Sequence, residues 1–202
     1  MKSILISIKP KYVADILNGK KTIEIRKTMP KCDLPIDVYI YCTKGIHNLV
    51  KPKELDKYLL FTNGALKSVS ETSLNGKVVA KFTLNKVEYF EREYSSRYID
   101  DYYGDKGEPL NKKFYKKACL TEDELFDYIG SGSGYAWHIS NLVIFDTPKE
   151  LSEFNSYKKV HKCDVCPIER MCIGFCGKNT YSTILKPLTK APQSMCYVQT
   201  EE

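Results

Sequence analysis

Residues 4–27, ILISIKPKYVADILNGKKTIEIRK, carry the pattern of a strand, a short helix and a second strand. The β-branched run from Ser3 to Ile8 is typical of a strand, and Pro10 suits the first turn of a helix. Gly19 is placed to end that helix in the left-handed conformation. TIEIR at residues 22–26 then has the two-residue period of a strand. This order predicts a domain in which helix and strand are mixed.

The charged residues of this stretch gather where the helix gives way to the second strand. Lys21 follows the helix end, and Thr22, Glu24 and Arg26 share one face of the strand, while the two isoleucines between them face a core. These side chains can converge on one polar site. The alternative is an ion pair of Glu24 with Arg26 or Lys21 at a solvated edge, which would contribute little stability. On the chemistry alone, this ion pair is the favoured interpretation.

The rest of the chain is mostly strand in pattern. We expect further strands at residues 37–43, 77–87, 135–145 and 194–199, and a short helix at 52–61. Residues 89–118 are rich in tyrosine and charge, and we expect them to form a long insertion lying on the sheet. A capping box at Thr121 and Glu124 predicts another helix start. Without regular alternation of strand and helix, an α+β, barrel-like domain fits best.

Length and composition place the chain among globular proteins. Its 202 residues, 43% of them hydrophobic, suit a single domain over 1–202. The apolar run near the start is too short for a secretory signal, and no later run is long enough for a membrane span. We therefore expect a cytoplasmic protein that does not insert into membranes.

The net charge of +6 is unevenly distributed. Residues 1–31 hold eight basic and two acidic residues, and residues 148–190 hold eight basic and four acidic ones. Basic ends would attract a polyanion such as nucleic acid, although an unpartnered basic surface is also common.

The motif residues bring a resemblance. Gly19, Lys21, Glu24 and Arg26 match G-x-K-x-x-E-x-R, and the order of the segments around them resembles that of ASCH domains in small bacterial and prophage proteins. The resemblance implies a PUA-like β-barrel of five or six mixed strands flanked by helices. It also implies a cleft in which Lys21 and Arg26 contact phosphate or base and Glu24 orients them or accepts from a base amine.

The same resemblance leaves catalysis open. Some small ASCH proteins remove the acetyl group from acetylcytidine with a Lys, a nucleophilic Thr and a Glu. Lys21 matches the lysine, but Glu24 stands at the nucleophile position and Lys81 at that of the catalytic Glu. Thr22 is a poor substitute for the nucleophile, and nucleophilic catalysis needs a hydroxyl beside a base. If the protein is an enzyme, Lys21 and Glu24 are its candidate catalytic residues; another family activity, a metal-dependent ribonuclease, is neither favoured nor excluded.

A cysteine-rich segment at residues 161–178 is the candidate metal site. Its four cysteines are spaced C-x2-C-x5-C-x3-C, and four clustered thiols in a reducing cell suit a structural Zn²⁺. An iron-sulfur cluster or unligated thiols are the alternatives, and His161 or Cys196 could replace one ligand. The four residues are Cys163, Cys166, Cys172 and Cys176.

Three more residues are candidate ligand contacts. In GYAWHIS, Tyr135 and Trp137 share one strand face and His138 lies on the other. A base could stack on either aromatic ring, whereas a Trp in such a strand is more often in the core. His138 could contact the ligand, although a structural histidine is the more common case.

The sequence thus supports three functional hypotheses. The first is an ASCH protein that binds RNA, a nucleotide or a modified nucleoside in the cleft around Lys21, Glu24 and Arg26. The second is an enzyme of nucleoside or RNA chemistry. The third is a phage-linked regulator with a protein partner.

Overall fold

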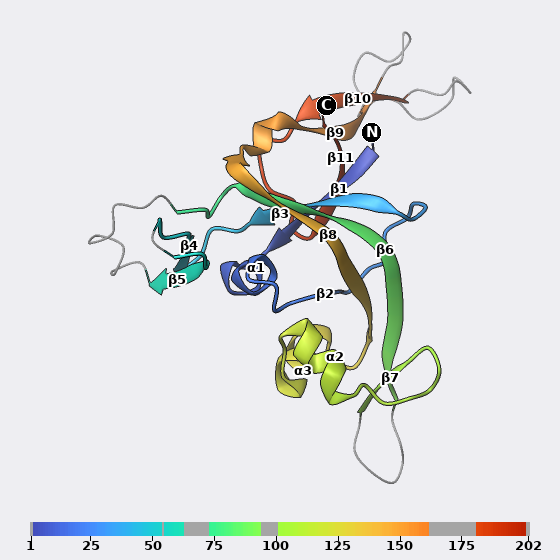
Figure 1. Ribbon diagram of the computed structural model, residues 1–202. Helices are drawn as coiled ribbons and strands as arrows, with labels where there is room; N and C mark the ends of the chain where they lie inside the picture. Colours follow the sequence, from blue (N-terminus) through green and yellow to red (C-terminus); the bar gives the residue numbers. More distant parts are fainter. Residues whose placement is uncertain (1, 54, 63–72, 94–100, 162–180, 201–202) are drawn as a thin grey trace.

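The computed structural model describes residues 2–53, 55–62, 73–93, 101–161 and 181–200. Three α-helices and a 3-10 turn accompany the strands of this part (Figure 1). The helical elements are α1 (Pro10–Leu17), α2 (Lys112–Ala118), α3 (Glu122–Ile129) and η2 (Leu151–Glu153). The strands are β1 (Lys2–Ile8), β2 (Ile23–Arg26), β3 (Ile36–Cys42), β4 (His47–Val50), β5 (Leu59–Thr62), β6 (Val78–Glu93), β7 (Asp101–Gly104), β8 (Ser133–Lys149), β9 (Phe154–His161), β10 (Tyr181–Pro187) and β11 (Met195–Thr200).

One mixed sheet organises the molecule. Its strands follow the order β10-β9-β11-β1-β3-β6-β8-β2, with β7 paired to β6 beside this path. β1 and β3 run parallel, and the remaining pairs of this sheet are antiparallel. β4 and β5 form a separate two-stranded sheet. The α+β class expected from the sequence is confirmed.

The expected closed barrel is wrong. In the described part of the chain, β10 and β2 stand at opposite ends of the pairing path and do not pair with each other. The reason lies in the two longest strands, β6 with 16 residues and β8 with 17. Both strands extend from the central part of the sheet toward α2 and α3 (Figure 1). β2 pairs only with this extended part, at residues 135–138 of β8.

The first helix forms where the residues at its two ends predict it. Pro10 occupies the first turn of α1, and Gly19 follows the helix with a φ of +71°. The Gly19 N–H donates to the Ile16 carbonyl at 2.9 Å. The predicted capping box at α3 is also present, with Thr121 and Glu124 each accepting from the other's backbone N–H. Both signals act within a few residues, so they do not depend on the rest of the fold.

The expected helix at 52–61 is wrong. None of the described residues in that range is helical, and β5 begins at Leu59. Residues 59–62 are half-buried and exposed in turn, which is the two-residue period of a strand with one covered face. The expected insertion at 89–118 contributes to ordered elements, since it includes the end of β6, all of β7 and all of α2.

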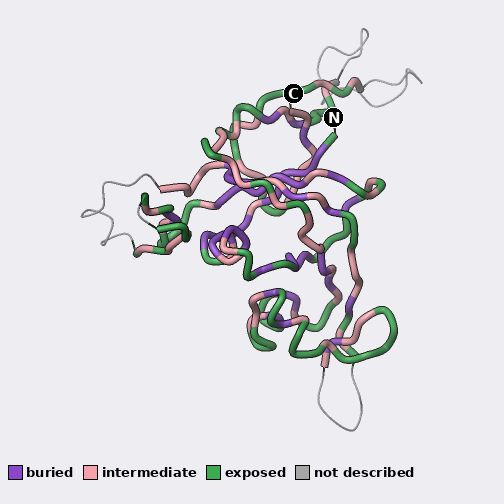
Figure 2. Tube along the Cα trace, in the orientation of Figure 1, coloured by how far each residue is buried: buried purple, intermediate pink, exposed green. Residues whose placement is uncertain are grey.

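The core lies in the central strands, where buried residues concentrate (Figure 2). β1 is buried on both faces from Ser3 to Ile6, since Ile4 and Ile6 belong to the main core cluster and Leu5 to another. A second cluster joins β2 to α2 and α3 through Ile23, Ile25 and Leu125. The short strand β2 therefore pairs with β8 in the sheet, and its isoleucines pack against the helices.

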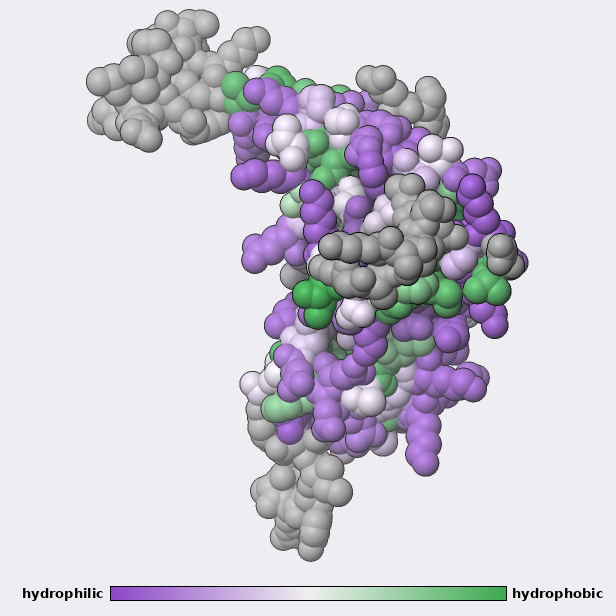
Figure 3. Space-filling view, turned by 90° about the vertical axis from the view of Figure 1, so that its left-hand side faces the viewer, coloured by the Kyte–Doolittle hydropathy of each residue, from purple (hydrophilic) through white to green (hydrophobic). Residues whose placement is uncertain are grey.

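On the face drawn in Figure 3, apolar residues form small groups between polar ones. Among the described residues, no helix is long and apolar enough to cross a membrane. The single-domain boundary 1–202 stays a prediction.

Candidate functional site

Lys21 is placed by the turn that ends α1. The N–H groups of Lys20 and Lys21 both donate to the Asp15 carbonyl, at 2.8 and 3.0 Å. The side chain of Lys21 is only 2% exposed, and its Nζ donates to the Ala118 carbonyl at 2.5 Å. The same Nζ lies 5.1 Å from the ring centroid of Tyr12. This lysine therefore connects the end of α2 to the start of β2 from inside the protein.

Glu24 lies between the two cations of the motif. Its Oε2 is 3.5 Å from Lys21 Nζ, and its Oε1 is 3.2 Å from Arg26 Nε. Glu24 is 7% exposed and Arg26 4% exposed. The ion pair that the sequence suggested does exist, but its expected position at a solvated edge is wrong, because both residues are buried.

Arg26 reaches two segments far from it in the chain. Its Nη2 donates to the Ser7 carbonyl at 3.0 Å, and its Nη1 to the Ser194 carbonyl and Oγ at 3.3 and 3.4 Å. The end of β1 and the loop before β11 thus cover the strand face that carries Glu24 and Arg26. Both motif cations donate hydrogen bonds to backbone carbonyl groups and thereby connect segments that are distant in the sequence.

A pocket of about 560 Å³ opens above this cluster. Such a volume is typical of small-molecule sites. Tyr12 of α1 and Tyr128 of α3 contribute its aromatic lining. Burial raises the pKa of both phenols above the ordinary value of 10.0, so both remain neutral hydroxyl groups at neutral pH, as unperturbed tyrosines do. The full lining is Ser7, Ile8, Lys9, Tyr12, Lys21, Glu24, Ile25, Arg26, Thr43, Leu120, Glu124, Asp127, Tyr128, Gln193 and Ser194.

The charges of the lining balance. Three basic residues and three carboxylates surround the pocket, so it offers no net positive charge for a phosphate. They are Lys9, Lys21, Arg26, Glu24, Glu124 and Asp127. The pocket suits a neutral polar ligand better than a polyanion.

The family follows from a comparison with family models. The model of the ASCH domain matches residues 6–123, which include the whole motif. The chain belongs to the ASCH domain family. A search of curated proteins found no match.

Solved ASCH structures resemble the chain distantly. ASCH from Zymomonas mobilis is 15% identical with a TM-score of 0.49, and the match covers 98% of this chain and 87% of that one. A tyrosine-to-phenylalanine mutant of the same protein is 18% identical with a TM-score of 0.44, covering 75% and 77%.

Some residues predicted for the site lie apart from the ASCH pocket. Thr22 is exposed and absent from the pocket lining. Its N–H donates to the Lys117 carbonyl, and its carbonyl accepts from the Ile139 N–H. The pocket therefore does not present the Thr22 hydroxyl as the missing nucleophile. Lys81 pairs with Asp37 at 2.9 Å and is likewise not part of the lining.

The three predicted residues of β8 also have other surroundings. Tyr135 and Trp137 pair with Arg26 and Glu24 across the sheet, as their shared face requires, but neither lines the pocket. Trp137 is fully buried in the main core cluster. His138 Nε2 lies 2.6 Å from a Glu88 carboxylate oxygen. Burial alone would raise the Glu88 pKa, but the hydrogen bond with Lys86 and then that with His138 lower it below its ordinary value.

Sequence analysis missed several pocket residues. Tyr12, Tyr128, Gln193 and Ser194 come from α1, α3 and the loop before β11. Tyr12 lies one position before the apolar stripe of α1, and only its position on the helix face could have drawn attention to it. No local pattern connects the loop before β11 with the ASCH motif, since Ser194 is 168 positions from Arg26.

An exposed ion pair connects α1 and α3 at this pocket. Lys11 Nζ lies 2.6 Å from Glu124 Oε1. The hydrogen bond from Lys11, followed by that from the Thr121 N–H, lowers the Glu124 pKa below its ordinary value of 4.5. Glu124 therefore stabilises the folded state at neutral pH, and this contribution is lost as the pH falls through the lowered pKa.

We expect Glu124→Gln to lower the free energy of unfolding at pH 7 by less than about 1 kcal/mol, because the pair is solvated. The difference from the parent protein should vanish below the Glu124 pKa. Urea unfolding at several pH values measures it. Glu108→Gln is the control, since the structure shows no ion pair for this exposed residue within the described ranges. A difference that grows as the pH falls would contradict the assignment.

The structure has a second pocket of about 680 Å³ near the C-terminal end of α1. Lys20, Lys51 and Lys57 line it, but Asp56 and Asp146 also do, and Lys51 lies 3.6 Å from Asp56. This pocket does not contain the motif residues.

The four cysteines of the predicted metal site lie outside the described residues. Among the described residues, no group of three or more His, Cys, Asp and Glu side chains could hold a metal ion. Zinc binding by Cys163, Cys166, Cys172 and Cys176 stays a prediction.

Proposed function

We propose that this ASCH protein binds RNA or a nucleoside by taking one unpaired nucleoside into the motif pocket. The observation that carries the proposal is the combination of an open pocket, two lining tyrosines from different helices and a buried carboxylate in the same lining. Single-stranded RNA is commonly recognised through bases that stack on aromatic side chains and form hydrogen bonds at their edges.

The charge balance of the pocket favours the base over the phosphate. Lys21 and Arg26 already donate to carbonyl groups and face Glu24. They are thus less suited to bind phosphate than the motif alone suggested. In an RNA strand, phosphates would lie outside the pocket and respond to salt, whereas binding of a free nucleoside would depend little on salt.

Tyr128 is the best position for a test, because it lines the pocket and is 40% exposed. We expect Tyr128→Ala to weaken binding of a nucleoside or a short single-stranded RNA by about tenfold, as loss of a stacking ring does. Isothermal titration with the four common nucleosides and fluorescence anisotropy with a labelled single-stranded RNA measure this.

Tyr157→Ala is the matched control. Tyr157 is 38% exposed and lies on β9, outside the pocket lining. Its substitution should leave affinity unchanged. Equal losses in both variants would contradict stacking on Tyr128, and no binding of any nucleoside or RNA by the parent protein would reject the proposed function.

A further inference from the structure

Helix α2, with the sequence KKFYKKA, carries four lysines and no acidic residue. At about 100° per residue, the lysines cover an arc of about 140° on one side of the helix. Phe114, Tyr115 and Ala118 occupy the other side, where they pack in the cluster that contains the isoleucines of β2. The lysines form the basic face of α2. They are Lys112, Lys113, Lys116 and Lys117, and all four are exposed.

The basic face has no acidic partner in the described part of the chain. None of its lysine side chains forms an ion pair or a hydrogen bond with another described residue. Lys112 and Lys116 are four positions apart, as are Lys113 and Lys117, and like charges at this spacing repel each other on a helix. The two lysines of the first turn are also disfavoured by the helix macrodipole. The lysines are therefore not explained by the stability of α2, whereas bound phosphate groups would relieve their repulsion.

Two hydrogen bonds attach the end of α2 to the ASCH motif. The Thr22 N–H donates to the Lys117 carbonyl at 2.9 Å, and Lys21 Nζ donates to the Ala118 carbonyl at 2.5 Å. Leu120, three residues after Lys117, lines the motif pocket together with Lys21. In Figure 1, α2 lies beside α3, the helix that contributes Tyr128 to the same lining. The basic face thus begins next to the pocket.

A fifth lysine, Lys20, lies at the same junction. Its N–H donates to the Asp15 carbonyl in the turn after α1, and its side chain is exposed and forms no ion pair with a described residue. Burial raises the pKa of the Cys119 thiol at the C-terminal end of α2, and Lys20 is one of the nearby cations that oppose this rise. The Lys20 charge is therefore close to the end of α2, and it extends the basic face toward α1.

We propose that Lys20 and the four lysines of α2 bind phosphate groups of the RNA strand whose unpaired nucleoside enters the motif pocket. This inference rests on the proposed function and names the ligand as a polynucleotide rather than a free nucleoside. The pocket lining has balanced charges and offers a phosphate no net attraction. The lysines beside it supply that attraction, because an ammonium group binds phosphate as a point charge whatever the base sequence.

The variant Lys116→Gln/Lys117→Gln tests the surface, since glutamine is uncharged and also a good helix former. We expect affinity for a short single-stranded RNA to fall about tenfold, and the slope of log affinity against log salt to become shallower by about 1.4, because each phosphate contact on a single strand contributes about 0.7. Fluorescence anisotropy over a series of salt concentrations measures both. Nucleoside affinity in isothermal titration should not change, because neither lysine lines the pocket.

Lys158→Gln/Lys159→Gln is the matched control. It removes the same charge from two neighbouring exposed lysines of β9, which lies far from β2 in the order of the sheet. In Figure 1, β9 and α2 are at opposite ends of the molecule. The control should keep the salt slope of the parent protein. Equal losses of RNA affinity in the two double variants would show that net charge alone matters, and they would overturn the inference.

Lys20→Gln tests the same surface without changing α2. We expect it to make the salt slope shallower by about 0.7, the contribution of one phosphate contact. If Lys116→Gln/Lys117→Gln does not fold, Lys20→Gln decides the matter, and a salt slope equal to that of the parent protein would overturn the inference.

An anionic membrane surface is the other polyanion that exposed lysines could bind. Flotation with vesicles of phosphatidylserine and phosphatidylcholine tests it. Loss of vesicle binding in Lys116→Gln/Lys117→Gln, with RNA affinity unchanged, would reject RNA as the partner. If the parent protein binds a nucleoside but the salt slope for RNA is the same in every variant, the inference is wrong and nucleoside binding stands. If neither a nucleoside nor a single-stranded RNA binds, the proposed function and this inference both fail.

Discussion

We expect Glu24→Ala to lower the free energy of unfolding by about 3–5 kcal/mol, the loss typical of removing one member of a buried ion pair. Lys21 and Arg26 are 2% and 4% exposed, so hydration cannot replace the interaction that each loses with the carboxylate. Both lie within 3.5 Å of Glu24. The substitution leaves two neighbouring buried cations that repel each other.

Urea unfolding followed by the fluorescence of the single tryptophan measures this loss. Asp37→Ala is the matched control, because Asp37 also pairs with a strand lysine, at 2.9 Å, but its side chain is 31% exposed. The control should lose no more than about 1 kcal/mol. Similar losses in the two variants would show that the motif cluster does not behave as a buried one.

The sequence predicted the elements that neighbouring residues determine. Pro10 and Gly19 set the limits of α1, and the capping box set the start of α3. Each of these signals involves atoms within four residues of one another. The family motif likewise identified the residues of the pocket floor, because it is contained in one turn and one strand.

The burial of those residues could not be predicted in the same way. A two-residue period places Glu24 and Arg26 on one face of β2, but it cannot show what covers that face. The cover comes from Ser7 and Ser194, which are distant in sequence and meet Arg26 only in the folded sheet. Closure of the barrel failed as a prediction for the same reason, since it depends on which distant strands pair.

The segment wrongly predicted as a helix has only a weak conformational preference of its own. Residues 52–61 contain charged residues and leucines at spacings that suit a helix, and no strand partner is visible nearby in the sequence. In the structure, β5 pairs with β4, with Leu59 opposite Val50. Pairing with a neighbouring strand decided the conformation of a segment whose own preference was weak.

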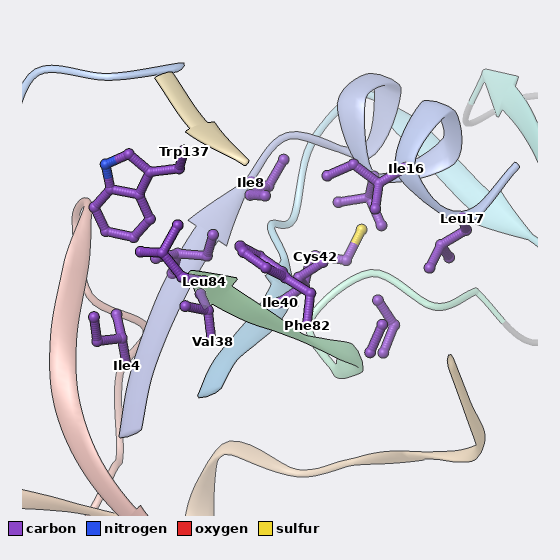
Figure 4. Packing of buried hydrophobic residues seen from close by; sticks show 14 of the residues in the cluster. Ile4, Ile8, Ile16, Leu17, Val38, Ile40, Cys42, Phe82, Leu84 and Trp137 are labelled. Atoms are coloured by element: carbon purple, nitrogen blue, oxygen red, sulfur yellow. The ribbon is translucent and has the colours of Figure 1, made fainter. Parts of the chain in front are cut away.

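Trp137→Ala is expected to lower the free energy of unfolding by about 3–5 kcal/mol, as large core truncations do. Trp137 is fully buried and belongs to the cluster that includes Ile4, Val38 and Leu84 (Figure 4). Removing the indole leaves a cavity that the surrounding strands cannot fill, because they are fixed by the sheet. Thermal unfolding followed by far-ultraviolet circular dichroism measures the loss, since the variant has no tryptophan.

Trp137→Phe separates a packing role from a ligand role. The indole Nε1 is buried and has no hydrogen-bond partner among the described residues, so phenylalanine removes an unsatisfied donor while keeping an aromatic ring in the core. We expect this variant to lose less than half as much stability as Trp137→Ala and to keep full nucleoside affinity, because Trp137 does not line the pocket. If Trp137→Phe were as stable as the parent protein but bound nucleosides at least tenfold more weakly, Trp137 would be a ligand contact. The pocket would then extend past β2 as far as Trp137 on β8.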